Sequence, residues 1–383
     1  MKINFFAPMN NLGYGIHAYN TIREFEKRGH EIVLIPPLGK INREMDNDIR
    51  RWFNNRESFS PKDPSIMIFM EDFLPQFSGD PRIGFPVFEL EKFTPVQLAG
   101  LRSCDYLFTP SAWGKGVLVS NGLDENKIFI VNEGYDPDIF PYFKTSTSED
   151  LNQPFTFVHV GKFEERKGTM QIIDCFARAL ENEEARLLMS IHNPFRPTYP
   201  EIQNLLARLG FKCAENAEGR KICRRKLLSI HFHAPVNDHK DLSLLYQQAD
   251  CGLYPSRAEG WGLPILETLA TGVPCIVGNW TGQSEYLGEN FRMFNDEEEY
   301  YYKEGIRGAV KRERADDGIW FDGSRGDWNV VTDEALAWWI KHSFENYRKY
   351  RKTEEWSMEV SRLRQFTWAR AAKQLEAALL KII

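Results

Sequence analysis

Short apolar runs, each bounded by turn residues, alternate with amphipathic stretches along most of this chain. A short buried run predicts a strand, and apolar residues that recur every three or four positions predict a helix. Alternation of the two is typical of a parallel sheet with helices on both faces, so we predict an α/β fold. The predicted strands lie at residues 2–7, 31–35, 65–70, 82–88, 106–109, 128–131, 155–160, 187–191, 230–232, 251–254 and 275–277.

Helical spacing marks several stretches. One predicted helix ends at Gly29, one follows the strand at 155–160, one runs from about Pro264 to about Thr271, and one closes the sequence. The positions expected on their buried faces are Ile16, Tyr19, Ile22 and Phe25, then Ile172, Ile173, Phe176, Ala177 and Leu180, and finally Ala371, Leu375 and Leu379.

With 383 residues the chain exceeds the size at which one hydrophobic core stops growing, so two domains are expected. The polar run 145–154 has no apolar periodicity and precedes the strand at 155–160. We place the boundary there, with a Rossmann-like domain at 1–150, a second one at 151–364 and a C-terminal helix at 365–383. A hinge in the polar run would let the two domains close on a ligand.

The most informative stretch sets Glu259 and Glu267 around a Gly-rich turn that enters a helix. Pro264 suits the first helical position. Glycines let the backbone approach a ligand closely, and a helix N-terminus favours phosphate or polarised sugar oxygens. We expect Glu259 in the approach loop and Glu267 in the first helical turn, where both could accept hydrogen bonds from ligand hydroxyl groups. A glutamate alone in a first turn more often only complements the helix dipole.

Cationic residues follow a predicted strand nearby. The loop 161–168 places Lys162 and Lys167 just beyond the strand at 155–160. In parallel sheets ligands bind outside the carboxyl ends of the strands. Lysines and glutamates together at one sheet edge fit a diphosphate joined to a polyol, and His233, after another strand, could border a nucleotide base.

Residues 155–287 resemble the donor half of the retaining glycosyltransferases of family 4. The resemblance implies the GT-B fold, in which two doubly wound Rossmann-like domains face a central cleft and the final helix crosses back to the first domain. The matching segments are the loop 161–168, the Glu-x7-Glu element at Glu259 and Glu267, and the stretches 272–277 and 282–285.

The resemblance also implies residue roles. Lys162 and Lys167 would bind the donor diphosphate, although the arginine usual at the first of these positions is a lysine here, which offers no bidentate fork. Glu259 would meet the donor sugar near its reacting end, and Glu267 would take the ribose hydroxyls. Sugar hydroxyls or phosphate would be held by the backbone of the turn residues Gly260, Trp261, Gly262 and Leu263.

The N-terminal half offers less specific candidates. Gly13 and Gly15 form a Gly-rich turn between the first strand and the first helix. In the family this loop lies near the donor phosphates and the acceptor, which makes His17 a candidate acceptor contact. Many relatives also carry a histidine that faces the donor sugar. The comparable segment here has none, and Glu89 is the candidate in its place, although a surface glutamate is an equally good interpretation.

The predicted enzyme is a hexosyltransferase. It would move a sugar from a nucleoside-diphosphate sugar, with UDP-sugar preferred and GDP-mannose second, to a hydroxyl of a glycan or glycoconjugate. The resemblance implies retained anomeric configuration through a same-face displacement, in which the leaving phosphate takes the acceptor proton. Lys162, Lys167 and the helix N-terminus at Leu263 would stabilise the departing diphosphate without a metal or other cofactor.

Other functions stay open. Some viral relatives glycosylate hydroxymethylated DNA bases, but the net charge of -6 disfavours nucleic acid as a partner. A sugar-nucleotide epimerase would need acid and base groups on both faces of the sugar ring. A non-catalytic protein would bind the donor without turnover, and a dinucleotide oxidoreductase would need a third glycine where Ala18 stands.

Composition adds limits. Hydrophobic residues make up 42% of the chain, and no apolar run approaches the roughly 20 residues that cross a bilayer. The first residues are unlike a signal peptide, so a cytoplasmic enzyme is expected. The six cysteines show no Cys-x-x-Cys pairing, which favours reduced core thiols over a zinc site or a disulfide scaffold. The charged runs 297–302 and 311–317 predict solvated surface.

Overall fold

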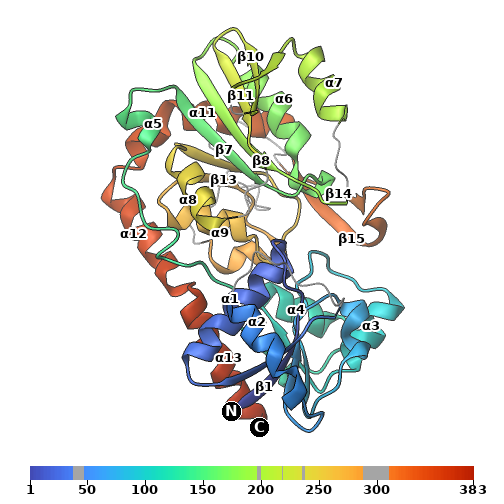
Figure 1. Cartoon of the computed structure of the whole chain (residues 1–383). Coiled ribbons are helices and arrows are strands. Elements are labelled where there is room, and N and C mark those ends of the chain that lie inside the picture. The colour runs from blue at the N-terminus through green and yellow to red at the C-terminus, as the bar shows by residue number, and fades with distance from the viewer. Residues whose placement is uncertain (38–46, 196–199, 218, 235–237, 288–309) are drawn as a thin grey trace.

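Two largely parallel sheets, each enclosed by helices, form the two halves of the computed structural model (Figure 1). The predicted α/β class is confirmed. The structure describes residues 1–37, 47–195, 200–217, 219–234, 238–287 and 310–383.

The N-terminal sheet is parallel throughout, in the order β2-β1-β3-β4-β5-β6. Each of its strands was predicted, although several end earlier than expected. They are β1 Lys2–Phe6, β2 Glu31–Ile35, β3 Ser65–Met67, β4 Arg82–Gly84, β5 Tyr106–Thr109 and β6 Ile128–Ile130. The helices of this half are α1 Gly13–Lys27, α2 Asn47–Asn54, α3 Pro95–Arg102 and α4 Ala112–Ser120, with short 3-10 turns at Asn55–Ser58, Glu71–Gln76 and Glu125–Lys127.

The C-terminal sheet has the order β13-β12-β7-β8-β11-β10-β9. Its strands are β7 Phe155–Gly161, β8 Ala185–Ile191, β9 Lys212–Glu215, β10 Lys221–Arg225, β11 Leu228–Phe232, β12 Cys251–Tyr254 and β13 Cys275–Val277. Its helices are α5 Thr147–Asp150, α6 Thr169–Ala179, α7 Pro200–Arg208, α8 His239–Gln247 and α9 Leu263–Ala270, with short 3-10 turns at Glu165–Lys167 and Thr281–Glu285.

The sequence did not predict β9, at the edge of this sheet, or its neighbour β10. These strands form a hairpin, and β10 runs antiparallel to both of its neighbours, β9 and β11. Cys213 and Cys223 lie directly opposite each other in this hairpin and form a disulfide. The expectation of reduced core thiols is wrong for this pair, because the hairpin register brings them together and Cys213 is exposed. The remaining cysteines are free, with Cys175, Cys251 and Cys275 buried and Cys104 half-buried.

The last part of the chain returns to the N-terminal half. β14 Val310–Asp316 and β15 Asp322–Val331 form an antiparallel hairpin. α11 Asp333–Tyr350 then packs on α6, α12 Glu354–Arg362 and a 3-10 turn at Leu363–Gln365 follow, and α13 Trp368–Ile382 packs on α1 (Figure 1). The charged residues 311–314 on β14 are exposed, as expected, whereas the run 297–302 lies outside the described residues.

Two segments of the chain pass from one half to the other, and they lie side by side. Tyr135, after β6, donates its N–H to Phe366 O at 3.0 Å, and Trp368 N–H donates to Tyr135 O at 3.3 Å. The polar run 145–154, where we expected a hinge, contains α5 instead. Ser146 and Ser148 in that run donate hydrogen bonds to the buried carboxylate of Asp250. The run is thereby tied to the C-terminal half.

Each helix in the described part of the chain falls short, in length or in apolar character, of what crossing a membrane requires.

Candidate active site

Charged residues of both halves meet at their interface. Arg166, in the 3-10 turn after β7, places Nη1 2.9 Å from Glu259 Oε2 and Nη2 3.3 Å from Glu89 Oε1. Lys167 Nζ lies 2.5 Å from Glu259 Oε1. We call Glu89, Arg166, Lys167 and Glu259 the junction group. The sequence pointed to all of them except Arg166, which stands within a charged run and follows no pattern of its own.

Arg166 and Glu259 are buried, whereas Lys167 and Glu89 are partly exposed, and the two carboxylates balance the two cations. Burial alone would raise the pKa of Glu259, but attraction to Lys167 and Arg166 outweighs it and lowers this pKa to about 2. Burial lowers the pKa of Lys167, against the opposing pull of Glu259. For Arg166 the carboxylates overcome the effect of burial and raise the pKa. Glu259 is therefore an anion throughout the physiological pH range, held between cations that a diphosphate could also bind.

Lys162 has other partners. Its Nζ lies 2.5 Å from Glu164 Oε1 and within 6 Å of the ring centroids of Phe195 (5.8 Å) and Trp320 (5.7 Å). Glu164 also accepts a hydrogen bond from Arg166 at 3.2 Å. Among the described residues, Lys162 is thus linked to the junction group through Glu164 alone, and it points toward the β14–β15 hairpin.

The Gly-rich turn before α9 packs against the other half of the protein. Gly262 has a φ of 90°, a left-handed conformation that favours glycine. A Cβ on Gly260 would lie 2.5 Å from Val87 Cγ1, so glycine allows the halves to touch here. The indole of Trp261 is buried in the core, with its ring centroid 5.1 Å from that of Tyr286 and 5.9 Å from that of Phe366, because the returning tail covers it. The expected donor contact of this residue is through its backbone, and it stays a prediction.

The position of Glu267 differs from the prediction. α9 begins at Leu263, the residue expected at the helix N-terminus, so Glu267 falls in the second turn and not in the first. Its side chain is buried, and its Oε1 lies 3.8 Å from His239 Nδ1. Burial raises the pKa of Glu267 to about 8.

The expected Gly-rich turn at Gly13 and Gly15 is the first turn of α1. A Cβ on Gly15 would lie 2.2 Å from Asn10 O, so glycine there permits close packing of the preceding loop. Ile22 and Phe25 of α1 are buried as predicted. Ile16 and Tyr19 are only half-buried, because the face with His17 and Ala18 turns inward.

His17 is not accessible to an acceptor in this arrangement. It is 1% exposed, and its ring centroid lies 4.5 Å from that of Phe85 and 6.0 Å from that of Trp368. Burial lowers its pKa to about 3, so the ring is neutral. His233 follows β11 and donates its backbone N–H to Met189 O at 2.8 Å. No contact among the described residues joins His233 to the junction group.

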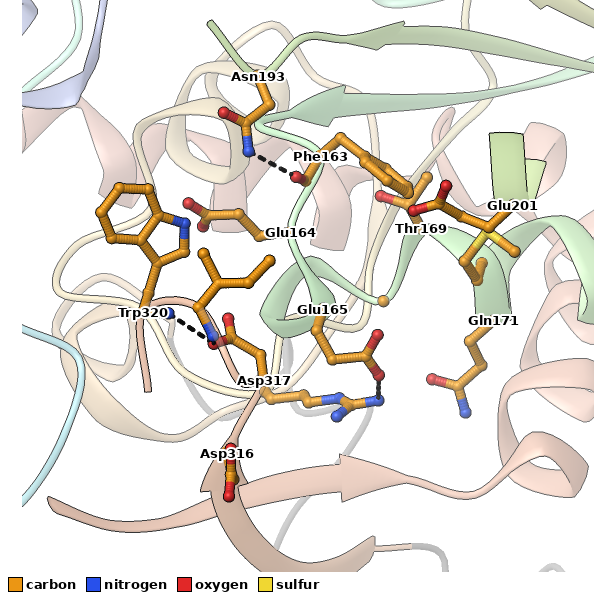
Figure 2. Close-up of a pocket in the computed structure, with 14 residues that line it drawn as sticks. Phe163, Glu164, Glu165, Thr169, Gln171, Asn193, Glu201, Asp316, Asp317 and Trp320 are labelled. Carbon is orange, nitrogen blue, oxygen red and sulfur yellow. Dashed lines mark hydrogen bonds and ion pairs between the residues drawn. The ribbon is translucent and has the colours of Figure 1, made fainter. Parts of the chain in front are cut away.

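A pocket of about 570 Å³ lies on the C-terminal half, between the loop 161–168, α6 and the β14–β15 hairpin (Figure 2). Its lining includes Glu164, Glu165, Asp317 and Trp320. Glu259, Arg166 and Lys167 do not line it, so we place the candidate active site at the junction group and not in this pocket.

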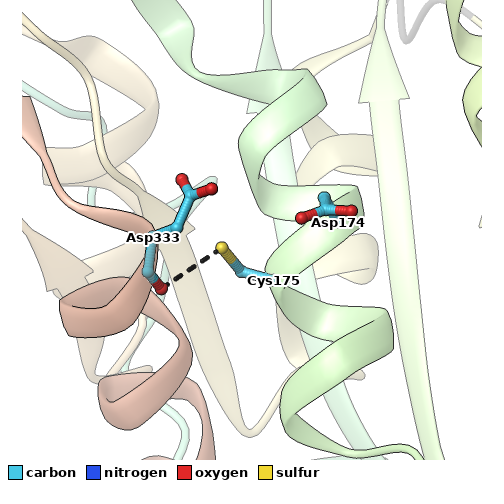
Figure 3. A group of neighbouring side chains, drawn as sticks. All are labelled: Asp174, Cys175 and Asp333. Atoms are coloured by element: carbon cyan, nitrogen blue, oxygen red, sulfur yellow. Dashed lines mark hydrogen bonds between the residues drawn. The ribbon is translucent and has the colours of Figure 1, made fainter.

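A group of possible metal ligands lies on α6 and at the start of α11: Asp174, Cys175 and Asp333 (Figure 3). Arg178 pairs with both carboxylates, at 2.8 Å from Asp174 and 3.2 Å from Asp333. Burial, followed by the charge of Asp333, raises the pKa of the Cys175 thiol to about 12. A paired arginine and a protonated thiol both oppose cation binding, so we assign no metal here.

Residues 144–313, which contain every member of the junction group except Glu89, match the family model "Glycosyl transferases group 1". This segment is a group 1 glycosyltransferase domain. Mannosylfructose-phosphate synthase of Agrobacterium fabrum (strain C58) is 27% identical over 185 residues, which are 46% of this chain and 38% of that protein. O-antigen chain mannosyltransferase B of Escherichia coli is 46% identical over 50 residues, 13% of each. Less than half of either relative is therefore matched.

Several solved structures share the whole fold. Sucrose-phosphate synthase from Thermosynechococcus elongatus has a TM-score of 0.66 at 14% identity, covering 100% of this chain and 99% of that chain. Anabaena HepE in complex with UDP and glucose has a TM-score of 0.64 at 14% identity, with 100% of both chains covered. At such identities the likeness shows the fold alone: two Rossmann-like domains arranged as in GT-B. The predicted fold class is confirmed.

Proposed function

We propose that the protein is a retaining glycosyltransferase of the family 4 type. It would transfer a sugar from a nucleoside-diphosphate sugar to a hydroxyl of a glycan or glycoconjugate. The observation that carries this proposal is the junction group, where Arg166 and Lys167 flank the ionised Glu259 and Glu89 approaches from the opposite half. The match to the group 1 model over residues 144–313 supports it.

Each residue of the junction group has a chemical task in this proposal. Arg166 and Lys167 bind the donor diphosphate and stabilise the charge that grows on it as it departs. Glu259, which stays ionised, accepts hydrogen bonds from sugar hydroxyls. Glu89 faces the sugar from the N-terminal half. These cations supply the positive charge, so the proposal requires no metal or other cofactor.

The bond changes in the proposed reaction occur on one face of the sugar. The bond from the anomeric carbon to the diphosphate oxygen breaks, and the acceptor oxygen forms its bond to that carbon on the same side. The proton of the acceptor hydroxyl moves to the departing phosphate oxygen. No side chain has to act as the base, and the anomeric configuration is retained.

The donor nucleotide is proposed as UDP first and GDP second. A UDP complex of a protein with the same fold favours the first, and the mannosyl names of both curated relatives keep GDP-mannose as the second candidate. For the acceptor, the net charge of -6 favours a glycan over DNA, because DNA binding relies on neutralising phosphates.

A panel of UDP, GDP, ADP and dTDP sugars tests the proposal through thermal stability and nucleotide release. A donor at about 100 times its dissociation constant should stabilise the protein by about 2.7 kcal/mol. Glu259→Gln should lower turnover by about 100-fold, the usual order for loss of one transition-state contact. Glu165→Gln, on the same loop but half-exposed and paired with Arg257, is the matched control and should keep its activity. If wild type neither binds a donor nor releases nucleotide, the proposal fails.

A further inference from the structure

The β14–β15 hairpin bridges the two halves of the protein (Figure 1). Val331, at the end of β15, is buried in the core of the C-terminal half. Farther along the hairpin, Arg325 O accepts a hydrogen bond of 3.1 Å from Lys92 N–H, in the N-terminal half. Lys92 belongs to residues 85–94, which carry Glu89 and which we call the Glu89 segment. The hairpin is therefore anchored in one half and bound to the other.

The Glu89 segment depends on such contacts for its position, because it forms neither helix nor strand. Before Glu89, Val87 N–H donates to Tyr14 Oη at 3.0 Å, and Val87 O accepts a hydrogen bond from the same hydroxyl at 2.8 Å. After Glu89, Glu91 O accepts a hydrogen bond from Asn121 Nδ2 at 2.8 Å. These contacts within the N-terminal half hold the segment on both sides of Glu89, and the hairpin adds contacts from the other half.

Arg312, on β14, connects both sides of the junction group. Its Nη2 lies 3.1 Å from Glu91 Oε1, and its Nη1 donates a hydrogen bond to Asn329 Oδ1 at 3.2 Å. Asn329 N–H in turn donates to Arg257 O at 3.2 Å, and Arg257 N–H donates to Arg166 O at 2.8 Å. A continuous series of contacts therefore runs from the Glu89 segment through Arg312 to the backbone of the junction group.

A buried apolar cluster joins the same parts of the chain. Trp328, on β15, is 1% exposed and shares this cluster with Leu90 and Ala258. Leu90 directly follows Glu89, and Ala258 directly precedes Glu259. Burial of an indole removes a large apolar area from water. The cluster therefore favours the arrangement in which the neighbours of both glutamates lie together.

We propose that the β14–β15 hairpin positions Glu89 against the donor sugar, with Arg312 as the positioning residue. Arg312 binds no substrate atom in this proposal, and it acts by holding the Glu89 segment. A displacement of the order of 1 Å is enough to misalign reacting groups, so losing this contact affects turnover more than donor binding. This inference rests on the proposed function. The match to the group 1 model ends at residue 313, so most of the hairpin lies outside it.

Arg312→Ala tests the inference through donor turnover. UDP-glucose is the probe, or GDP-mannose if wild type prefers GDP. The kcat of nucleotide release should fall about tenfold, whereas the affinity for UDP or GDP should stay unchanged, because the cations that bind the diphosphate are retained. Arg312 is 44% exposed and pairs with a half-exposed carboxylate, so the variant should fold and keep its thermal midpoint. An unchanged kcat would overturn the inference.

Glu89→Gln separates positioning from a general structural effect. If Arg312 acts through Glu89, then Arg312→Ala should lower kcat no further in a protein that already carries Glu89→Gln, because the positioned carboxylate is gone. A structural effect independent of Glu89 would instead lower kcat about tenfold in both backgrounds. That additive result, or a Glu89→Gln variant with the kcat of wild type, would overturn the inference.

Arg314→Ala is the matched control. Arg314 is exposed on the same strand, and its Nη1 donates to Gly323 O at 3.1 Å, within the hairpin. This variant should keep the kcat of wild type. The same tenfold loss in Arg314→Ala would overturn the assignment to Arg312. A wild type that binds no donor and releases no nucleotide would refute the proposed function itself, whereas an active wild type with additive losses refutes only the inference about the hairpin.

Discussion

At the scale of single residues, the junction group is an ion-pair network around two buried side chains, Arg166 and Glu259. The side chain of Arg166 is 7% exposed and forms ion pairs with Glu259, Glu164 and Glu89 at the same time. Removing one partner of a buried pair leaves the other charge without compensation, which costs far more than losing a surface pair. A bound diphosphate would compete with these carboxylates for the same cations.

Arg166→Ala should therefore lower the free energy of unfolding by about 3 kcal/mol and weaken donor binding as well. Arg178→Ala is the control, because Arg178 is 46% exposed and its pair with Asp174 is a surface pair. That variant should lose less than about 1 kcal/mol. Urea denaturation of both measures the difference, and equal losses would show that Arg166 has no special structural role.

Glu133 and Glu267 predict a pH dependence. Their pKa values rise from the ordinary 4.5 to about 8 on folding, so the native state retains protons that the unfolded chain has released. Stability should then fall as pH rises from about 4.5 to about 8, by about 1.4 kcal/mol per pH unit for each group. Urea denaturation at pH 6.5 and pH 8.5 measures this loss. Glu133→Gln should show a smaller loss, and an unchanged pH profile in that variant would contradict the assignment.

The sequence identified residues where a motif marked them. Lys167 and Glu259 stand at fixed places around glycines, and the structure brings them together. Arg166 was missed, because it stands within a charged run and follows no pattern of its own. The burial of the Trp261 indole could not be predicted, because it depends on Phe366, which lies far along the chain. Local sequence indicates which residues can bind a ligand, but not which are covered by distant segments.

At the scale of elements, the strands of the parallel sheets were predictable because each is a buried apolar run. The β9–β10 hairpin was not, because β9 is exposed along its whole length and carries no such run. The disulfide between Cys213 and Cys223 could not be predicted either, because it depends on the register of this hairpin.

Alkylation of the unfolded protein tests this disulfide. Without a reductant, the free cysteines Cys104, Cys175, Cys251 and Cys275 should react, and Cys213 and Cys223 should react only after reduction. Cys213→Ser should lower stability by no more than about 3 kcal/mol, since the closed loop is short. Donor binding should not change, because the hairpin lies at the far edge of the sheet. Alkylation of all six cysteines without reductant would show that the bond is absent.

At the scale of the whole molecule, the two halves contact each other through residues that leave little space. A Cβ on Gly260 would meet Val87 Cγ1 at 2.5 Å and Phe88 O at 2.9 Å. The halves are also joined by Glu285, which accepts a hydrogen bond from Ala112 N–H at the start of α4 at 2.7 Å. That the chain forms two halves could be predicted from its length. The return of the tail over both halves could not, because it depends on contacts between distant segments.

Gly260→Ala should keep the halves from closing and lower turnover by at least about tenfold, since a displacement of the order of 1 Å is enough to misalign reacting groups. Gly116→Ala is the control, because a Cβ there meets nothing within 4 Å and alanine favours the helix by about 1 kcal/mol. Small-angle scattering with and without donor measures how far each variant contracts when the halves close. An equal contraction of Gly260→Ala and Gly116→Ala would show that the Gly260 contact does not control closure.

The paired crossing at Tyr135 and Phe366 limits how the halves can move. The segments that connect them run side by side and share the hydrogen bonds of Tyr135 with Phe366 and Trp368. A single flexible tether would permit rotation about any axis, but a doubled, hydrogen-bonded connection resists twisting and sideways sliding while it still permits bending across its width. We therefore expect the two halves to open and close like a clamshell, mainly along one degree of freedom, so that each closure brings the same residues face to face.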